Sequence, residues 1–158
     1  MDGTISGSDR AALTDAASRR HLAALLRSAR WGAADEAEVL ATAARIRDRD
    51  PDSWVSEWVW SAGEVWSAAN QAASSDPGAG AGALYLRAAT YYGAALSQVV
   101  RSAEHHRAAA LWRRQRFCWD RAADHAGAQR MEVPYAGASL PAYFFPAPAP
   151  IGQRRPLI

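Results

Sequence analysis

The feature that most constrains this sequence is an apolar stripe at α-helical spacing, which recurs five times within residues 9–127. In its first occurrence the stripe follows the i, i+3, i+4, i+7 pattern through Leu22, Leu25, Leu26 and Ala29. A helix of this kind buries its apolar face only by packing against another element, and here the neighbouring elements are further helices. The pattern therefore predicts a mainly α fold, a bundle of five helices.

Capping residues and helix breakers give approximate bounds for the first two helices. Ser8 or Asp9 is expected to cap the first helix, and Gly32 is placed to end it. Asp50-Pro51 is expected to end the second, because the residue before a proline disfavours the α region. This second helix is predicted over residues 35–47, with an apolar face of Val39, Leu40, Ala43, Ala44 and Ile46.

Three longer helices are predicted next. Asp52 or Ser53 is expected to cap the third, the Ser- and Gly-rich stretch 74–82 breaks the chain after it, and Gly127 ends the fifth. Their expected bounds are about 53–73, 83–102 and 104–126. Their apolar stripes are Trp54, Trp58, Ala62, Val65 and Ala69; Leu84, Ala88, Tyr91, Ala95 and Val99; and Leu111, Trp112, Cys118, Trp119 and Ala122. A single interior is not expected to bury all four tryptophans of the third helix, Trp54, Trp58, Trp60 and Trp66.

After residue 127 the apolar period changes from that of a helix to that of a strand. A turn at 136–138 separates an alternating run from a second extended run at 140–145, which predicts a β-hairpin. Pro141 suits an edge strand, and residues 153–158 are typical of the approach to another strand. A two-stranded hairpin is marginally stable alone, so it is expected to begin a larger sheet. The alternating apolar residues of the first run are Met131, Val133 and Tyr135.

The charge pattern argues against a nucleic-acid or membrane partner. The 18 basic residues, all arginines, are interleaved with 16 acidic residues, for a net charge of +2. A nucleic-acid-binding domain usually concentrates its positive charge on one face. The densest basic run, Arg113, Arg114 and Arg116, is expected to be a solvated face. Neither a signal-peptide pattern nor an apolar run of about 18 residues occurs, so a cytoplasmic protein is expected.

Neither a metal nor another cofactor is expected. The single cysteine, Cys118, excludes an internal disulfide, and its position in a helical stripe predicts a small buried apolar residue. Adjacent histidines point apart on a helix, whereas a helical zinc site needs i, i+4 spacing. The only residues that suggest a metal site are Glu104, His105 and His106, with His21 or His125 as a third ligand.

Three segments carry a resemblance to a known family. They read D-P-D-S-W-V-S-E-W at 50–58, Y-L-R-A-A-T-Y-Y at 85–92 and V-P-Y-A-G, continuing to L-P-A-Y-F-F, at 133–145. In order and spacing, residues 30–158 resemble the N-terminal half of lidded α/β-hydrolases related to dihydroxypseudooxynicotine hydrolase and to the fermentation/respiration-switch, esterase-like proteins. The resemblance implies a flexible leader at 1–8, a helical cap at 9–127 and the first strands of a truncated α/β-hydrolase domain at 128–158.

The resemblance also implies an activity that needs more than these residues. The family is one of Ser-His-Asp hydrolases, with the serine on a G-x-S-x-G elbow, and no such motif occurs in the 158 residues. No catalytic residue is therefore assigned, and the rest of the hydrolase core is an expected partner, in cis or as a separate chain. The implied reaction is hydrolysis of an ester, a thioester or a ketone C–C bond in a small aromatic or polyketide-like molecule.

In such enzymes the cap closes over the active site and shapes its pocket. The adjacent Tyr91 and Tyr92 point in different directions on a helix, so one is expected to pack inside while the other, with Arg87, faces the substrate. The predicted substrate-binding residues are Trp58, Arg87, Tyr91 and Tyr92.

A second interpretation has no catalysis. A free-standing helical module could bind a protein partner or a small apolar ligand, and could form a homo-oligomer by pairing the hairpin at 130–145 between chains. A helical transcription regulator is a weaker third interpretation, because the positive charge is scattered and no clear helix-turn-helix is present.

Overall fold

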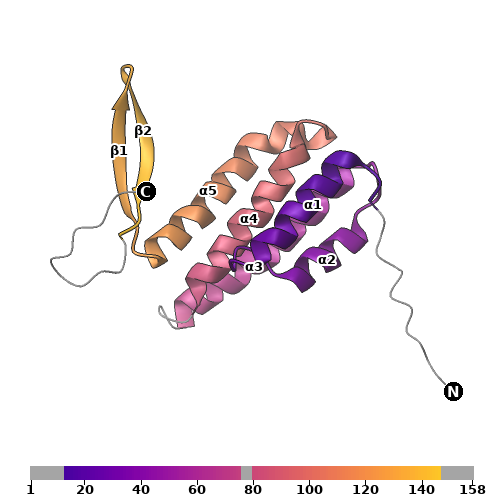
Figure 1. The fold of residues 1–158 in the computed structure, drawn as a ribbon, viewed down its shortest axis with the longest axis horizontal. Helices are drawn as coiled ribbons and strands as arrows, with labels where there is room; N and C mark the ends of the chain where they lie inside the picture. Colours follow the sequence, from indigo (N-terminus) through magenta and orange to yellow (C-terminus); the bar gives the residue numbers. More distant parts are fainter. Residues whose placement is uncertain (1–12, 76–79, 147–158) are drawn as a thin grey trace.

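A computed structural model describes residues 13–75 and 80–146. This part of the chain contains five α-helices, a short 3-10 helix and a two-stranded antiparallel sheet, which confirms the predicted mainly α bundle followed by a hairpin (Figure 1). The elements are α1 (Ala16–Ala29), α2 (Glu36–Arg45), α3 (Pro51–Ser75), α4 (Ala81–Val99), η1 (Ala103–Arg107), α5 (Ala108–His125), β1 (Gln129–Tyr135) and β2 (Ala138–Phe144).

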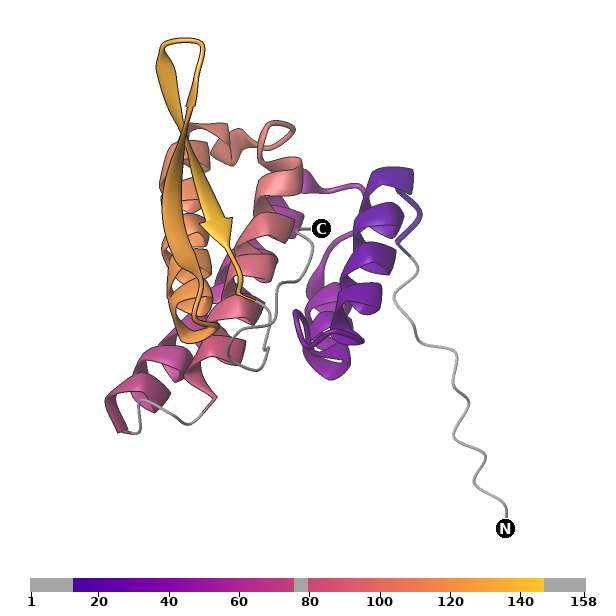
Figure 2. The ribbon, with the colours of Figure 1, turned by 60° about the vertical axis from the view of Figure 1, so that its left-hand side comes forward.

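The three long helices form the body of the bundle. Helix α4 packs against both α3 and α5, and α1 and α2 lie away from the hairpin in both views (Figures 1 and 2). Small residues on α4, such as Ala88 and Ala95, are fully buried, which lets its neighbours approach closely. As predicted, the tryptophans of α3 divide between interior and surface: Trp54 and Trp58 are buried, and Trp60 and Trp66 are exposed.

The first helix begins later than predicted. Asp15 caps α1 by accepting a hydrogen bond from the Ser18 N–H at 2.9 Å. Thr14 lies directly before this cap. The Asp48 carboxylate, in the α2–α3 connection, accepts hydrogen bonds from the backbone N–H and the hydroxyl of Thr14. The predicted caps Ser8 and Asp9, and the predicted leader, lie outside the described residues.

The Asp50-Pro51 pair starts a helix instead of ending one. Helix α2 already ends at Arg45, and Pro51 is the first residue of α3, a position at which its missing N–H and fixed φ are favourable. The Asp50 carboxylate accepts the Ser53 N–H at 2.9 Å and so caps α3, in place of the predicted Asp52 or Ser53. Ser53 is buried, and its hydroxyl accepts the Arg47 N–H.

Other differences lie at helix ends and at two apolar positions. Helix α4 ends at Val99, and the predicted start of the fifth helix is the 3-10 helix η1, capped by Ser102. Trp112 is 57% exposed although it was predicted inside, because Leu111 and Cys118 point toward α4 and Trp112 is turned away from them. Ala44 is also exposed.

The hairpin matches its prediction, with a tighter turn. Ala136 and Gly137 form a two-residue turn with φ values of 47° and 82°, and Ala138, predicted in the turn, is the first residue of β2. The register pairs Val133 with Leu140 and Arg130 with Tyr143. The rest of the predicted proline-rich connector and residues 153–158 lie outside the described residues.

No helix in residues 13–75 or 80–146 has the length and apolarity that a bilayer span requires.

Candidate functional site

A polar cluster joins α4 to the start of α2. The Arg87 guanidinium lies 3.8 Å from the Asp35 carboxylate and 3.3 Å from that of Glu38. The Tyr91 hydroxyl donates to Glu38 at 2.7 Å and accepts the Asp35 N–H at 2.9 Å. Burial, and then the bond to Glu38, raise the pKa of Tyr91, so its phenol remains neutral at physiological pH. The sequence predicted that Arg87 and a tyrosine share a face, but α2 lies some fifty residues away and its carboxylates were missed.

The four predicted substrate-binding residues separate into two groups. Trp58 is fully buried, with its ring centroid 5.4 Å from that of Tyr91, so these two residues and Arg87 form one cluster. Tyr92 is also buried but lines a hollow on another side of α4. Of the four, Arg87 keeps the most exposed side chain, at 24%. Their contact with a substrate stays a prediction.

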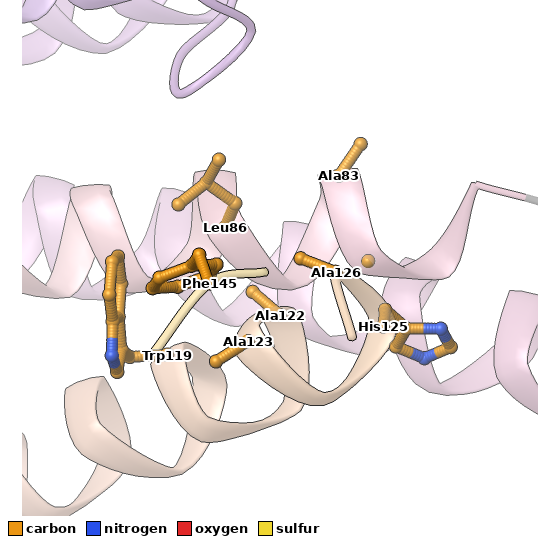
Figure 3. A pocket seen from close by; sticks show the side chains of 9 residues that line it. Ala83, Leu86, Trp119, Ala122, Ala123, His125, Ala126 and Phe145 are labelled. Carbon is orange, nitrogen blue, oxygen red and sulfur yellow. The ribbon is translucent and has the colours of Figure 1, made fainter. Parts of the chain in front are cut away.

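An apolar hollow of about 320 Å³, which we call the hairpin-side hollow, lies between the start of α4 and the end of α5 (Figure 3). Phe145, directly after β2, contributes its ring to this hollow beside Leu86 and Trp119. No sequence motif indicates this hollow, since its lining comes from three segments far apart in the chain. The lining residues are Gly82, Ala83, Leu86, Trp119, Ala122, Ala123, His125, Ala126 and Phe145.

A close crossing of α4 and α5 forms one end of the hairpin-side hollow. A Cβ atom on Gly82 would lie 2.6 Å from the Cβ of His125, so only glycine allows this approach. The His125 ring stacks on Tyr85 with centroids 6.0 Å apart. His125 is the last residue of α5, one position before the predicted end of the fifth helix.

Tyr143 attaches the hairpin to α5 next to the hairpin-side hollow. Its hydroxyl donates to Asp120 and accepts from Arg116 at 2.7 Å, and its ring meets Trp119 edge to face at 6.1 Å. Burial and the bond to Asp120 raise the pKa of Tyr143. A second link joins Arg130 of β1 to Asp124 at 2.9 Å. These contacts fix the position at which the chain leaves the bundle. They also place Arg116 in a pairing network, whereas the sequence predicted a solvated residue.

The residues considered for a metal site do not come together. Within the described residues, no group of three or more His, Cys, Asp or Glu side chains is arranged to hold a metal ion. His105 and His106 are exposed, with ring centroids 6.2 Å apart. Cys118 is buried as predicted, and burial raises the pKa of its thiol to about 11.

Comparison with known proteins relates the chain to α/β-hydrolases. No protein-family model matches it. It is 41% identical over 68 residues to a protein named Hydrolase LUC6, from a Fusarium species, and 41% identical over 71 residues to Alpha/beta hydrolase psoB from Aspergillus fumigatus. These matches cover 43% and 45% of this chain but only 16% of each relative. They support an α/β-hydrolase relationship, and this chain corresponds to a small part of those proteins.

Proposed function

We propose that this chain is the helical cap and opening strands of a serine α/β-hydrolase of the lidded kind related to dihydroxypseudooxynicotine hydrolase. Residues 9–127 form the cap, and residues 128–158 begin the catalytic domain. The observation that carries the proposal is the 41% identity to two proteins named as hydrolases, each much longer than the matched part. The catalytic serine, acid and histidine belong to the remainder of the core, either in cis or on a separate chain.

The exposed apolar face of the hairpin supports this proposal. Met131, Val133, Tyr135 and Leu140 are each 45–67% exposed, although alternation and register place them on one face. A hairpin with such a face is stable when it joins a larger sheet. The remaining strands of a hydrolase core would cover these side chains.

The hairpin-side hollow supports a role of the cap in shaping the substrate pocket. It is lined almost entirely by apolar side chains and lies where the chain passes from bundle to hairpin. Such a wall fits a small aromatic or polyketide-like substrate with an ester, a thioester or a ketone C–C bond, and it would exclude water during hydrolysis.

Among the predicted substrate-binding residues, we assign direct contact to Arg87, whose side chain is partly exposed while Trp58, Tyr91 and Tyr92 are buried. Trp58 and Tyr91 hold α4 against α2 and α3 and so position Arg87. Tyr92 lies on a different side of α4.

The test begins with the DNA downstream of the codon for Ile158. The proposal expects the frame, or a neighbouring gene, to encode a glycine-rich oxyanion loop followed by G-x-S-x-G. Hydrolysis of a p-nitrophenyl ester is then expected only when cap and core are both present, and to be lost when the elbow serine is changed to alanine. A stop codon with no core encoded nearby would refute the proposal.

The same exposed hairpin face favours a second candidate, a non-catalytic module that self-associates through residues 130–145. In that case size-exclusion chromatography gives a soluble oligomer, Leu140→Arg converts it to a monomer, and no core polypeptide confers esterase activity. A chain that remains monomeric at all concentrations excludes this candidate.

A further inference from the structure

A second hollow, of about 350 Å³, lies on the face of α5 opposite the hairpin-side hollow. Helix periodicity separates the two, because the residues that α5 contributes to one hollow point away from those that it contributes to the other. This volume is within the range of small-molecule pockets. We call it the Tyr92 hollow; it is lined by Trp66 of α3, Tyr92 of α4, and Ala110, Arg113, Arg114 and Phe117 of α5.

The hydroxyl of Tyr92 is buried without a hydrogen-bond partner among the described residues. The other buried tyrosines of α4 are satisfied: Tyr85 donates to Asn70 at 2.7 Å and Tyr91 to Glu38 at 2.7 Å. Buried hydroxyls in folded proteins nearly always have a partner, so an exception calls for an explanation. Burial raises the pKa of Tyr92, and the side chain of Arg114, which lines the same hollow, opposes that rise.

The rim of the Tyr92 hollow carries positive charge that the described residues do not neutralise. Arg113 and Arg114 form no ion pair within residues 13–75 and 80–146, whereas Arg116 on the same helix lies 3.6 Å from Asp120. Two aromatic rings, Trp66 and Phe117, are 36% and 49% exposed and also line the hollow. The Tyr92 hydroxyl has almost no accessible surface, so a ligand reaches it only when the exposed Arg114 side chain turns toward that ligand. The hollow thus combines a buried donor, unpaired guanidinium groups and aromatic walls, and its complement is an anion on a flat apolar body.

We propose that the Tyr92 hollow binds a small aromatic carboxylate. Its carboxylate accepts hydrogen bonds from the Tyr92 hydroxyl and the Arg114 guanidinium, and its ring contacts Trp66 and Phe117. A carboxylate suits this set of donors because the planar guanidinium and the single phenol proton can satisfy two oxygens that carry one charge. Arg113 adds charge at the rim. The inference concerns this chain alone and does not depend on the proposed hydrolase activity.

The test compares 2-naphthoate with its neutral analogue 2-naphthamide by isothermal titration calorimetry on the 158-residue chain. We expect the acid to bind at least tenfold more tightly than the amide. Tyr92→Phe and Arg114→Gln are each expected to weaken binding of the acid about tenfold, the usual effect of losing a hydrogen bond to a charged group. The matched controls Tyr85→Phe, on the same helix, and Arg121→Gln, on α5 outside the hollow, should leave the affinity unchanged.

Tyr92→Phe removes only an unpartnered hydroxyl, so the variant is expected to fold, as circular dichroism will show. In the wild-type chain 2-naphthoate should shift the indole N–H resonance of Trp66, assigned by its loss in Trp66→Phe. Equal affinity for acid and amide, unchanged affinity in Tyr92→Phe, or no binding at millimolar concentration would overturn the proposal. A shift of Trp119 in place of Trp66 would also overturn it.

Discussion

Tyr91 and Tyr92 are adjacent and equally buried, yet their hydroxyls have opposite surroundings. The Tyr91 hydroxyl bridges the Glu38 carboxylate and the Asp35 N–H, while that of Tyr92 has no partner among the described residues. The free energy contributed by a buried polar group depends on whether it is paired, and much less on its burial alone. The same substitution should therefore have different effects at these two positions.

Replacing Tyr91 by phenylalanine is expected to lower the free energy of unfolding by about 1–2 kcal/mol, because it leaves Glu38 and the Asp35 N–H without this partner. Tyr92→Phe, the matched control, should leave stability unchanged or raise it. Urea denaturation followed by circular dichroism measures both. Equal losses in the two variants would contradict the assigned hydrogen bonds.

Cys118 is expected to resist alkylation while the chain is folded. Burial raises the pKa of its thiol to about 11, so at pH 8 almost none is the reactive thiolate, and the side chain is 1% exposed. Mass spectrometry after iodoacetamide treatment at pH 8 should find the native chain unmodified and the chain in guanidinium chloride fully modified. Native modification at the unfolded rate would show that the thiol is accessible.

At the scale of elements, carboxylate caps determine where helices α1 and α3 begin. Asp15 and Asp50 each accept a backbone N–H three residues ahead, and these bonds, from Ser18 and Ser53, lower the pKa of both carboxyls below 3.8. A carboxyl with a lowered folded pKa stabilises the fold above its unfolded pKa. That stabilisation is lost as the pH falls through the folded pKa.

The chain is therefore expected to lose stability as the pH falls below about 4 and the caps become protonated. Asparagine caps a helix about as well as aspartate does but does not titrate. The double variant Asp15→Asn, Asp50→Asn should lose less thermal stability over this pH range than the wild type. Asp124→Asn, at the end of α5 and away from both caps, serves as the control for removing a carboxylate that caps no helix. Parallel acid profiles of wild type and double variant would exclude this explanation.

The crossing of α4 and α5 predicts opposite effects for two glycine substitutions in one helix. Gly82→Ala should destabilise the fold by about 1–3 kcal/mol, because its methyl group would clash with the Cβ of His125, an atom next to the backbone. Gly93→Ala meets nothing within 4 Å among the described residues and should stabilise α4 by about 0.5–1 kcal/mol. Thermal unfolding measures both. A stabilising Gly82→Ala would show that the helices are farther apart.

At the scale of the whole molecule, the parts that the sequence predicted are those specified locally. Periodicity predicted the five helices and the hairpin because each buries or exposes residues a few positions apart. Asp50-Pro51 was misassigned because the same pair is compatible with a helix end and a helix start. Two features of the sites join segments that are far apart in the sequence. Phe145 lines the hairpin-side hollow beside α4 and α5, and Arg87 pairs with Asp35 and Glu38. No local pattern predicts such contacts.

The helical bundle is expected to fold without the hairpin, since both buried clusters consist of residues between Leu13 and Ala122. The hairpin attaches mainly through Tyr143 and Arg130, in partly exposed contacts that contribute little free energy. A chain ending at Ala128 should therefore keep cooperative thermal unfolding with nearly the same midpoint. A chain ending at Phe117 removes the buried Cys118 and Ala122 from α5 and should lose that cooperativity. If the chain ending at Ala128 also loses cooperative unfolding, the hairpin belongs to the folding unit of the bundle, and the boundary proposed after residue 127 is wrong.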